Sequence, residues 1–144
     1  SEMFEVVMEN YSDTQIAIAA AAVADFKPDN SHAQKIKKET DFNTINLVPT
    51  KDILATMGKE KKDQFLVGFA LETENELKNA IKKLKTKNLN AIVLNSLNDK
   101  GAGFSGDLNK ISFINQEGKP TDFELKSKAL VAQDVFSQIL KYYA

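Results

Sequence analysis

The chain has 144 residues, 42% of them hydrophobic, and its 19 basic and 20 acidic residues leave a net charge of −1. This length and composition predict one domain with a core of its own, and the balanced charge gives no global attraction to nucleic acid. The absence of cysteine excludes disulfides and thiolate chemistry, and the single histidine, His32, cannot build a zinc site alone. Because the sequence shows neither an apolar run long enough to span a membrane nor a signal peptide, we expect a cytoplasmic protein with no membrane partner.

Hydrophobic patterning predicts helices that alternate with strands. An apolar stripe predicts a helix over residues 2–11, and the continuous apolar run Gln15–Ala22 predicts a strand buried on both faces. A short strand is expected at Thr44–Val48. The next predicted elements are a helix over 53–62 capped by Asp52, a buried strand at Phe65–Leu71, a helix over 74–88 that begins with a Thr73–Glu76 capping box, and a buried strand at Ala91–Leu94.

The C-terminal part of the chain predicts an antiparallel pair and a last helix. Lys110–Asn115 and Asp122–Leu125 flank a turn, and a helix is expected from about Ser127 to Tyr142, with apolar residues such as Phe136 and Leu140 inside. Apolar strands that alternate with helices are typical of a parallel sheet between helices. The sequence therefore predicts an α/β, Rossmann-like three-layer fold, in which a mostly parallel sheet carries an antiparallel hairpin at one edge.

Three predicted loops follow the carboxyl ends of the buried strands, where open α/β sheets bind their ligands. The first loop, 23–38, carries Asp25 and the sequence KIKK at 35–38. A carboxylate suits a ribose hydroxyl or Mg²⁺, and lysines suit phosphoryl oxygens. The second and third loops, 70–74 and 95–109, are polar as well. This arrangement favours an anionic ligand such as a nucleotide or a phosphate ester.

Each of these features also has a purely structural interpretation. A run such as KIKK is more often solvated, Phe69 before the second loop is more often core than a base contact, and Lys83 and Lys87 on one helix face equally suit a solvated helix end. The sequence has no Gly-x-Gly-x-x-Gly after a strand and no Walker A motif. The residues alone leave three possibilities: a nucleotide-dependent enzyme, a nucleotide- or dinucleotide-binding module without chemistry of its own, and a scaffold domain.

Five segments, in order along the chain, resemble those of phosphopantothenoylcysteine synthetase (phosphopantothenate–cysteine ligase): AAVADF, KIKK, VGFALET, KNLNAIVLN and GFSGDLN. This family of the coenzyme A pathway is often the C-terminal half of a bifunctional bacterial flavoprotein. The resemblance implies that the carboxylate of 4′-phosphopantothenate attacks the α-phosphate of a nucleoside triphosphate, which is CTP in most bacterial members and is bound with Mg²⁺. The amine of cysteine then displaces CMP. Family members are generally homodimers.

The resemblance also implies roles for residues of this chain by their position. Lys35 opens the family's KxKK segment, which is a flap over the substrate, and it is implied to bind nucleotide and to act in the reaction with cysteine. The other implied nucleotide contacts are Asp25, which is also implied to hold Mg²⁺, Ala21 and Phe69 at the base, and Lys83 and Lys87.

The chain departs from the family's pattern in two places. Many members have Asn-Pro-Asp-Ile where this chain has Thr50-Lys51-Asp52-Ile53. The sequence also lacks the family's N-terminal segment, with its first strand, its Gly-rich turn and an ISNxSSG-like motif whose asparagine acts on the acyl-nucleotide intermediate. We therefore expect residues 1–144 to form a single synthetase domain without that segment, and the edge hairpin 110–125 to contribute to a homodimer.

Overall fold

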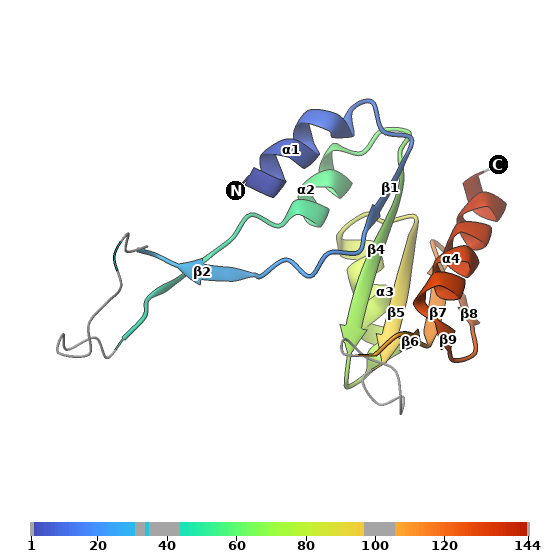
Figure 1. The fold of residues 1–144 in the computed structure, drawn as a ribbon. Coiled ribbons are helices and arrows are strands. Elements are labelled where there is room, and N and C mark those ends of the chain that lie inside the picture. Colours follow the sequence, from blue (N-terminus) through green and yellow to red (C-terminus); the bar gives the residue numbers. More distant parts are fainter. Residues whose placement is uncertain (1, 31–33, 35–43, 97–105, 144) are drawn as a thin grey trace.

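A computed structural model describes residues 2–30, 34, 44–96 and 106–143 of the chain. Its centre is a five-stranded sheet in the order β1-β4-β5-β7-β8, with helices on both faces (Figure 1). The predicted three-layer α/β fold is confirmed. Three neighbouring strands are parallel and two more form an antiparallel edge: β1 (Ile16–Ala19), β4 (Phe65–Glu72), β5 (Ala91–Ser96), β7 (Ile111–Asn115) and β8 (Pro120–Asp122).

The two central parallel strands are buried on both faces, as their continuous apolar sequences predict. Alternate side chains of β4 and β5 enter two separate hydrophobic clusters. Leu66 and Ile92 join the cluster beneath three helices, whereas Val67 and Val93 join the cluster beneath one. The first cluster is covered by α1 (Glu2–Tyr11), α2 (Ile53–Glu60) and α3 (Glu76–Thr86), and the second by α4 (Lys128–Tyr143).

Strand β1 differs from the prediction of a fully buried strand over Gln15–Ala22. It spans only Ile16–Ala19, and Ala17 is its one buried residue. The reason is that β1 is an edge strand of the sheet, since within the described residues it pairs with β4 alone. After Ala19 the chain leaves the sheet, and residues 20–30 are exposed.

A two-stranded arm projects from the body of the molecule (Figure 1). It consists of β2 (Phe26–Pro28) and β3 (Leu47–Pro49), which pair antiparallel. The sequence predicts β3 approximately, at Thr44–Val48, but treats the residues of β2 as irregular. A three-residue strand carries too little pattern of its own, and β2 exists only because its partner lies opposite it.

The N-termini of α2 and α3 contrast with each other. Asp52 caps α2 as predicted, because its Oδ1 accepts a hydrogen bond from the Ala55 N–H at 2.9 Å. The predicted Thr73–Glu76 capping box is wrong. The N-cap of α3 is Asn75, which has a left-handed backbone (φ 48°) and makes no side-chain cap. Glu76 instead accepts a hydrogen bond from Ser96 Oγ at 2.6 Å, which ties α3 to the end of β5.

The C-terminal elements follow the prediction in type and differ in detail. The hairpin's second strand, β8, precedes the predicted Asp122–Leu125 almost entirely, and a further short pair joins β6 (Leu108–Asn109) to β9 (Lys126–Ser127). The expectation that Phe136 and Leu140 lie inside is wrong, because α4 buries only one face against the sheet and both side chains are exposed.

None of the helices in the described residues has the length and apolar character that crossing a membrane requires.

The turn that follows α3 is clamped against α2. Gly58 packs so closely that a Cβ at this position would lie 1.8 Å from the Lys87 carbonyl oxygen. The Asn88 side-chain amide donates to the Gly58 carbonyl at 2.8 Å, and Lys61 Nζ donates to the Asn88 carbonyl at 2.6 Å. Lys61 Nζ also donates to Asn90 Oδ1, which accepts the Leu66 N–H of β4 as well. These contacts fix α2 relative to both α3 and the sheet.

Because of this close packing, we expect Gly58→Ala to destabilise the protein, although helix propensity alone would predict that it stabilises the helix. Alanine in place of glycine stabilises an unconstrained helix by about 1 kcal/mol. Here the added methyl group meets backbone, so we expect the free energy of unfolding to fall by about 1–3 kcal/mol in urea denaturation. Exposed Lys59 offers the control, since Lys59→Ala should change stability by less than about 0.5 kcal/mol. A more stable Gly58→Ala variant would contradict the close packing.

Candidate functional site

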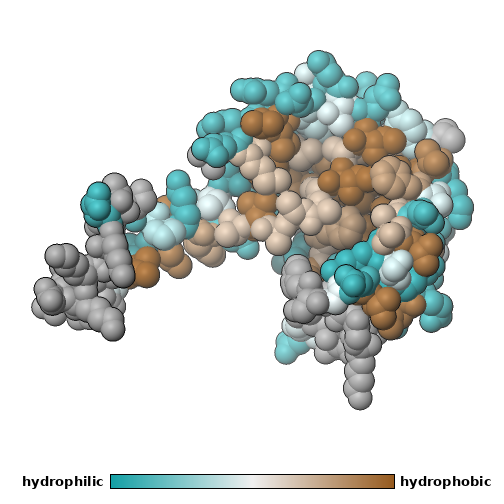
Figure 2. All heavy atoms as spheres, in the orientation of Figure 1, coloured by the Kyte–Doolittle hydropathy of each residue, from teal (hydrophilic) through white to brown (hydrophobic). Residues whose placement is uncertain are grey.

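A cavity of about 660 Å³ lies where the ends of β1 and β4 meet α1, the start of α2 and the base of the arm. Its volume is in the range of pockets that hold small ligands. In Figure 2, pale brown atoms, which mark weakly hydrophobic residues, cover the surface between α1 and the base of the arm. The alanine-rich stretch that begins at the last residue of β1, residues 19–24, contributes to this wall. The apolar run that predicts a buried strand thus becomes the lining of a cavity.

Five of the six site residues that the sequence suggests line this one cavity. They come from three separate parts of the chain, which are the stretch after β1, strand β4 and the end of α3: Ala21, Asp25, Phe69, Lys83 and Lys87. Phe69 lies within β4 and is half-buried, so it is neither fully buried in the core nor fully exposed on the surface. The sixth, Lys35, lies outside the described residues, as do the rest of KIKK and most of the Gly-rich loop 95–109. The structure therefore brings a possible base contact, two lysines and a carboxylate to one place.

Lys83 of α3 and Lys87, the C-cap residue of α3, each form an ion pair with a carboxylate. Lys83 Nζ lies 2.6 Å from Glu72 Oε1, and Lys87 Nζ lies 2.8 Å from Asp52 Oδ2. Glu72 ends β4 and its side chain is mostly buried, while Asp52 precedes α2. Sequence reasoning predicted Asp52 only as a helix cap and missed both ion pairs. An anionic ligand in the cavity would compete with these carboxylates for the lysines.

Asp52 joins a structural role to an electrostatic one. Its Oδ1 caps α2 and its Oδ2 pairs with Lys87. Partial burial alone would raise the pKa of this carboxyl, but the hydrogen bond from Lys87, the backbone N–H groups of Ala55 and Leu54 and the charge of Lys87 together lower the pKa below its usual value. Asp52 is therefore a firmly ionised group beside the cavity.

Asp25 is the residue that the sequence suggests for a metal. Within the described ranges, no group of three or more His, Cys, Asp or Glu side chains could hold a metal ion. Mg²⁺ is nevertheless often bound through one or two carboxylates together with water and substrate phosphates. The Asp25 carboxylate is exposed at the cavity and fits that kind of site.

Tyr11, at the end of α1, also lines the cavity and was not expected there as a functional residue. The residue is only 4% exposed, and its hydroxyl has no hydrogen-bond partner among the described residues. Burial, and then the negative charge of Glu60, raise the pKa of the phenol. Nothing in its sequence context distinguishes Tyr11 from the other members of the helix's apolar stripe.

A smaller cavity of about 380 Å³ lies on the other face of the sheet, against α4. Its wall is largely apolar and includes Ile18, Val131 and Val135, with Asn109 and Lys128 at its edge. Phe69 and Asn95 line both cavities. Because Lys128 is the one lysine among the described residues that line this cavity, the cavity is a weaker candidate for a polyphosphate than the larger one.

Two substitutions of Asp52 separate its cap from its ion pair. Asp52→Asn keeps an oxygen that caps α2, whereas Asp52→Ala removes both the cap and the charge. At neutral pH we expect Asp52→Ala to lower the free energy of unfolding by about 1 kcal/mol more than Asp52→Asn, because loss of an N-cap costs about that amount. Urea denaturation of both variants measures the difference. Equal stabilities would mean that the cap contributes nothing.

The wild type and Asp52→Asn together test the lowered pKa of Asp52. A carboxyl whose pKa is lower in the folded state stabilises the fold above its unfolded pKa, and that contribution is lost as the pH falls through the folded value. The stability difference between the wild type and Asp52→Asn should therefore be complete above the usual value of 3.8 and shrink in more acidic solution. A difference that grows on acidification would contradict the assigned direction.

Comparisons with known proteins assign the chain to a family. A family model described as DNA/pantothenate metabolism flavoprotein C-terminal domain matches residues 1–143. A cysteine/cysteine sulfinic acid decarboxylase from an unknown prokaryotic organism is 51% identical over 141 residues, which cover 97% of this chain and 39% of that protein. The coenzyme A biosynthesis bifunctional protein CoaBC of Bacillus subtilis is 39% identical over 139 residues, which cover 96% of this chain and 34% of that protein.

Solved structures agree with this assignment. The crystal structure of the C-terminal domain of a CoaBC protein is 35% identical, has a TM-score of 0.75, and is matched over 96% of this chain and 59% of its own. The DNA/pantothenate metabolism flavoprotein from Streptococcus pneumoniae, at 19% identity and a TM-score of 0.77, has the same fold. The chain spans 34–39% of the length of the two curated relatives described above.

Proposed function

The chain belongs to the DNA/pantothenate metabolism flavoprotein C-terminal domain family, and on this basis we propose that it serves phosphopantothenoylcysteine synthesis in the cytoplasm. Residues 1–144 would form part of one synthetase domain, whose N-terminal segment lies outside this sequence. Two findings support this assignment: the 39% identity to the Bacillus subtilis coenzyme A biosynthesis protein and the 59% coverage of a solved C-terminal domain of that kind.

The proposed reaction has two steps. In the first, the carboxylate of 4′-phosphopantothenate attacks the α-phosphorus of CTP, which forms an acyl-cytidylate and releases pyrophosphate. In the second, the amine of cysteine attacks the acyl carbon, so that an amide forms and CMP leaves. Activation is needed because a free carboxylate has no good leaving group, and cationic groups of the site offset the charge of the triphosphate.

The observation that carries this proposal is the cavity near the strand ends, because apolar, positively charged and negatively charged side chains line it together. Ala21 and Phe69 supply apolar contact for the cytosine base, and Lys83 and Lys87 supply charged hydrogen bonds for phosphates. Both lysines would exchange a carboxylate partner for a phosphate oxygen on binding. Asp25 would hold Mg²⁺, which neutralises phosphate charge when it is bound. Lys35 is proposed to act in the reaction with cysteine.

The proposal predicts that Lys83→Ala weakens CTP binding. A hydrogen bond to a charged group contributes about 1.5–3 kcal/mol, so the dissociation constant should rise roughly 10- to 100-fold. Isothermal titration with CTP and Mg²⁺ measures it. Lys82, the exposed neighbour that does not line the cavity, provides the matched control Lys82→Ala. Equal affinities of the two variants, or binding of NAD without CTP, would contradict the assignment.

The homodimer proposed for this chain is better supported by the arm than by the edge hairpin. Residues opposite each other in an antiparallel pair share a face, so Phe26, Pro28, Leu47 and Pro49 lie on the same face of the arm. All four are exposed, and Figure 2 shows hydrophobic side chains along the arm. By contrast, β8 exposes no large hydrophobic residue.

The geometry of the arm favours docking by its face. An isolated two-stranded ribbon is only marginally stable in water. The hydrogen bonds from Asp29 N to Asn46 O and from Thr50 N to Asp25 O place the backbone of Pro28 and Pro49 on the outer edges. Proline has no N–H, so both edges are poor templates for further strands. A twofold contact between the apolar faces of two arms would cover them instead.

This dimer predicts a contrast between neighbouring residues of β2. Phe26→Ser removes the largest side chain of the apolar face, whereas Lys27→Ser changes the opposite face of the same strand. We expect sedimentation velocity to find the wild type and Lys27→Ser dimeric, and Phe26→Ser shifted towards the monomer. A monomeric wild type, or loss of the dimer in Lys27→Ser alone, would contradict docking through this face.

A further inference from the structure

Among the residues that the structure describes, three lysines line the large cavity, and one of them differs from the other two. Lys83 and Lys87 each lie within 3 Å of a carboxylate oxygen, at 2.6 Å and 2.8 Å. Lys51 has no such partner: within the described part of the chain, its only recorded contact is with the ring of Phe4, whose centroid lies 4.5 Å from the Lys51 Nζ. Lys51 therefore brings a positive charge to the cavity that no described carboxylate neutralises.

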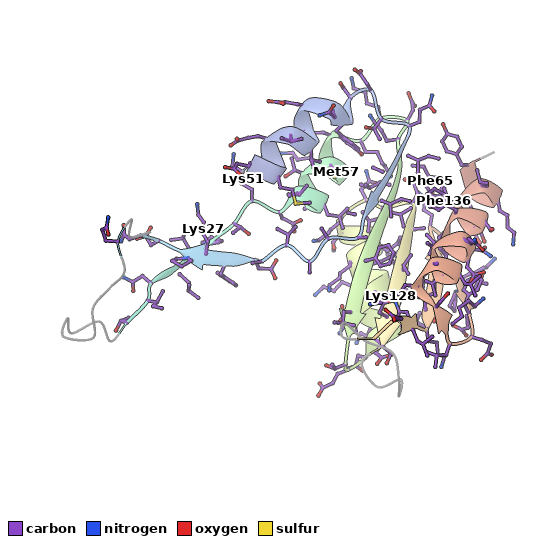
Figure 3. All side chains as sticks on the ribbon, viewed as in Figure 1. Lys27, Lys51, Met57, Phe65, Lys128 and Phe136 are labelled. Carbon is purple, nitrogen blue, oxygen red and sulfur yellow. The ribbon has the colours of Figure 1, made fainter. Side chains whose placement is uncertain are left out.

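The position of Lys51 places this charge at the start of α2. Figure 3 shows Lys51 where the chain passes from the arm into α2, beside the first part of α1. It directly precedes Asp52, the α2 cap that also holds Lys87. The first N–H groups of a helix carry partial positive charge and favour anions. Lys51, Lys87 and the α2 N-terminus therefore direct positive charge to one side of the cavity.

The backbone also brings Lys51 close to Asp25. Thr50, its neighbour, donates from its N–H to the Asp25 carbonyl at 2.8 Å and from its hydroxyl to the Ala24 carbonyl at 2.6 Å. Asp25, which is proposed to hold Mg²⁺, directly precedes β2, and the unpaired Lys51 follows β3, so both residues lie at the base of the arm. A magnesium-bound polyphosphate needs this combination, because the metal occupies some of its oxygens and leaves others for cations.

We propose that Lys51 binds the outer phosphates of the nucleoside triphosphate, an assignment that rests on the proposed function of the cavity. The contact between Lys51 and Phe4 is a weak attraction at an exposed site, whereas an ammonium–phosphate hydrogen bond is a strong one. Lys51 therefore moves from the ring to the phosphate without first losing an ion pair. Lys83 and Lys87 must each break an ion pair with a carboxylate before they can bind a phosphate. Many members of the family that this segment resembles have proline at the position of Lys51.

The test compares triphosphate and monophosphate binding in Lys51→Met, which keeps the aliphatic stem and removes the charge. Isothermal titration with CTP and with CMP, each with Mg²⁺, should show a roughly 10- to 100-fold loss for CTP. CMP affinity should change less than about threefold, because CMP has no outer phosphates. The salt dependence of CTP binding should also become flatter, since one charged contact is lost.

Two control variants separate charge from structure. Lys27→Met removes another exposed lysine of the arm, one that does not line the cavity (Figure 3), and should leave CTP binding unchanged. Lys51→Arg keeps the charge and should retain most of the affinity. Urea denaturation establishes that each variant is folded.

The outcomes distinguish this inference from the function on which it rests. If the wild type and Lys51→Met bind CTP equally, or if CTP and CMP lose affinity by the same factor, the role of Lys51 is overturned while the nucleotide site stands. If the wild type binds neither CTP nor ATP, the proposed nucleotide site itself fails, and the role of Lys51 fails with it.

Discussion

The contact between α2 and the turn after α3 is the constraint on which the large cavity depends. Gly58 lets the Lys87 carbonyl approach α2 more closely than any side chain would allow, and Asn88 and Lys61 hydrogen-bond across the same junction. The backbone of Lys87 is thus fixed at one side of α2, while its ammonium reaches the cap at the helix start. A packing requirement outside the cavity therefore decides where the charges of the cavity lie.

Sequence patterns predict the parts of this fold that depend on local chemistry. Continuous apolar runs identify β4 and β5, and Asp52 before an apolar helical pattern identifies a cap. Patterns fail where a distant partner decides the structure. The strand β2 exists through pairing with β3, and Glu76 bonds to Ser96 in place of a capping box. The alanines after β1 look buried in sequence, yet they line a cavity because β1 is an edge strand.

The same distinction applies to the candidate site. Family resemblance suggests which residues contact the ligand, and five of them line the cavity. The sequence does not predict which of the lysines form ion pairs. The pairing of Lys83 with Glu72 joins a helix to a strand end across 11 positions of the chain. The unpaired state of Lys51 is a property of its surroundings and not of its sequence neighbours. The sequence shows which residues are charged, but only the three-dimensional structure shows which of them form ion pairs.

We propose that this chain binds a nucleotide in the cavity between α1, α2 and the arm. The most direct test is the mapping of backbone amide chemical shifts during titration with CTP and Mg²⁺. The account predicts saturable changes in the segments that line the cavity: residues 19–25, 50–54 and 69–71, together with Lys83 and Lys87. Chemical-shift changes confined to α4 and the smaller cavity, or no changes even at a large excess of CTP, would contradict nucleotide binding in the large cavity.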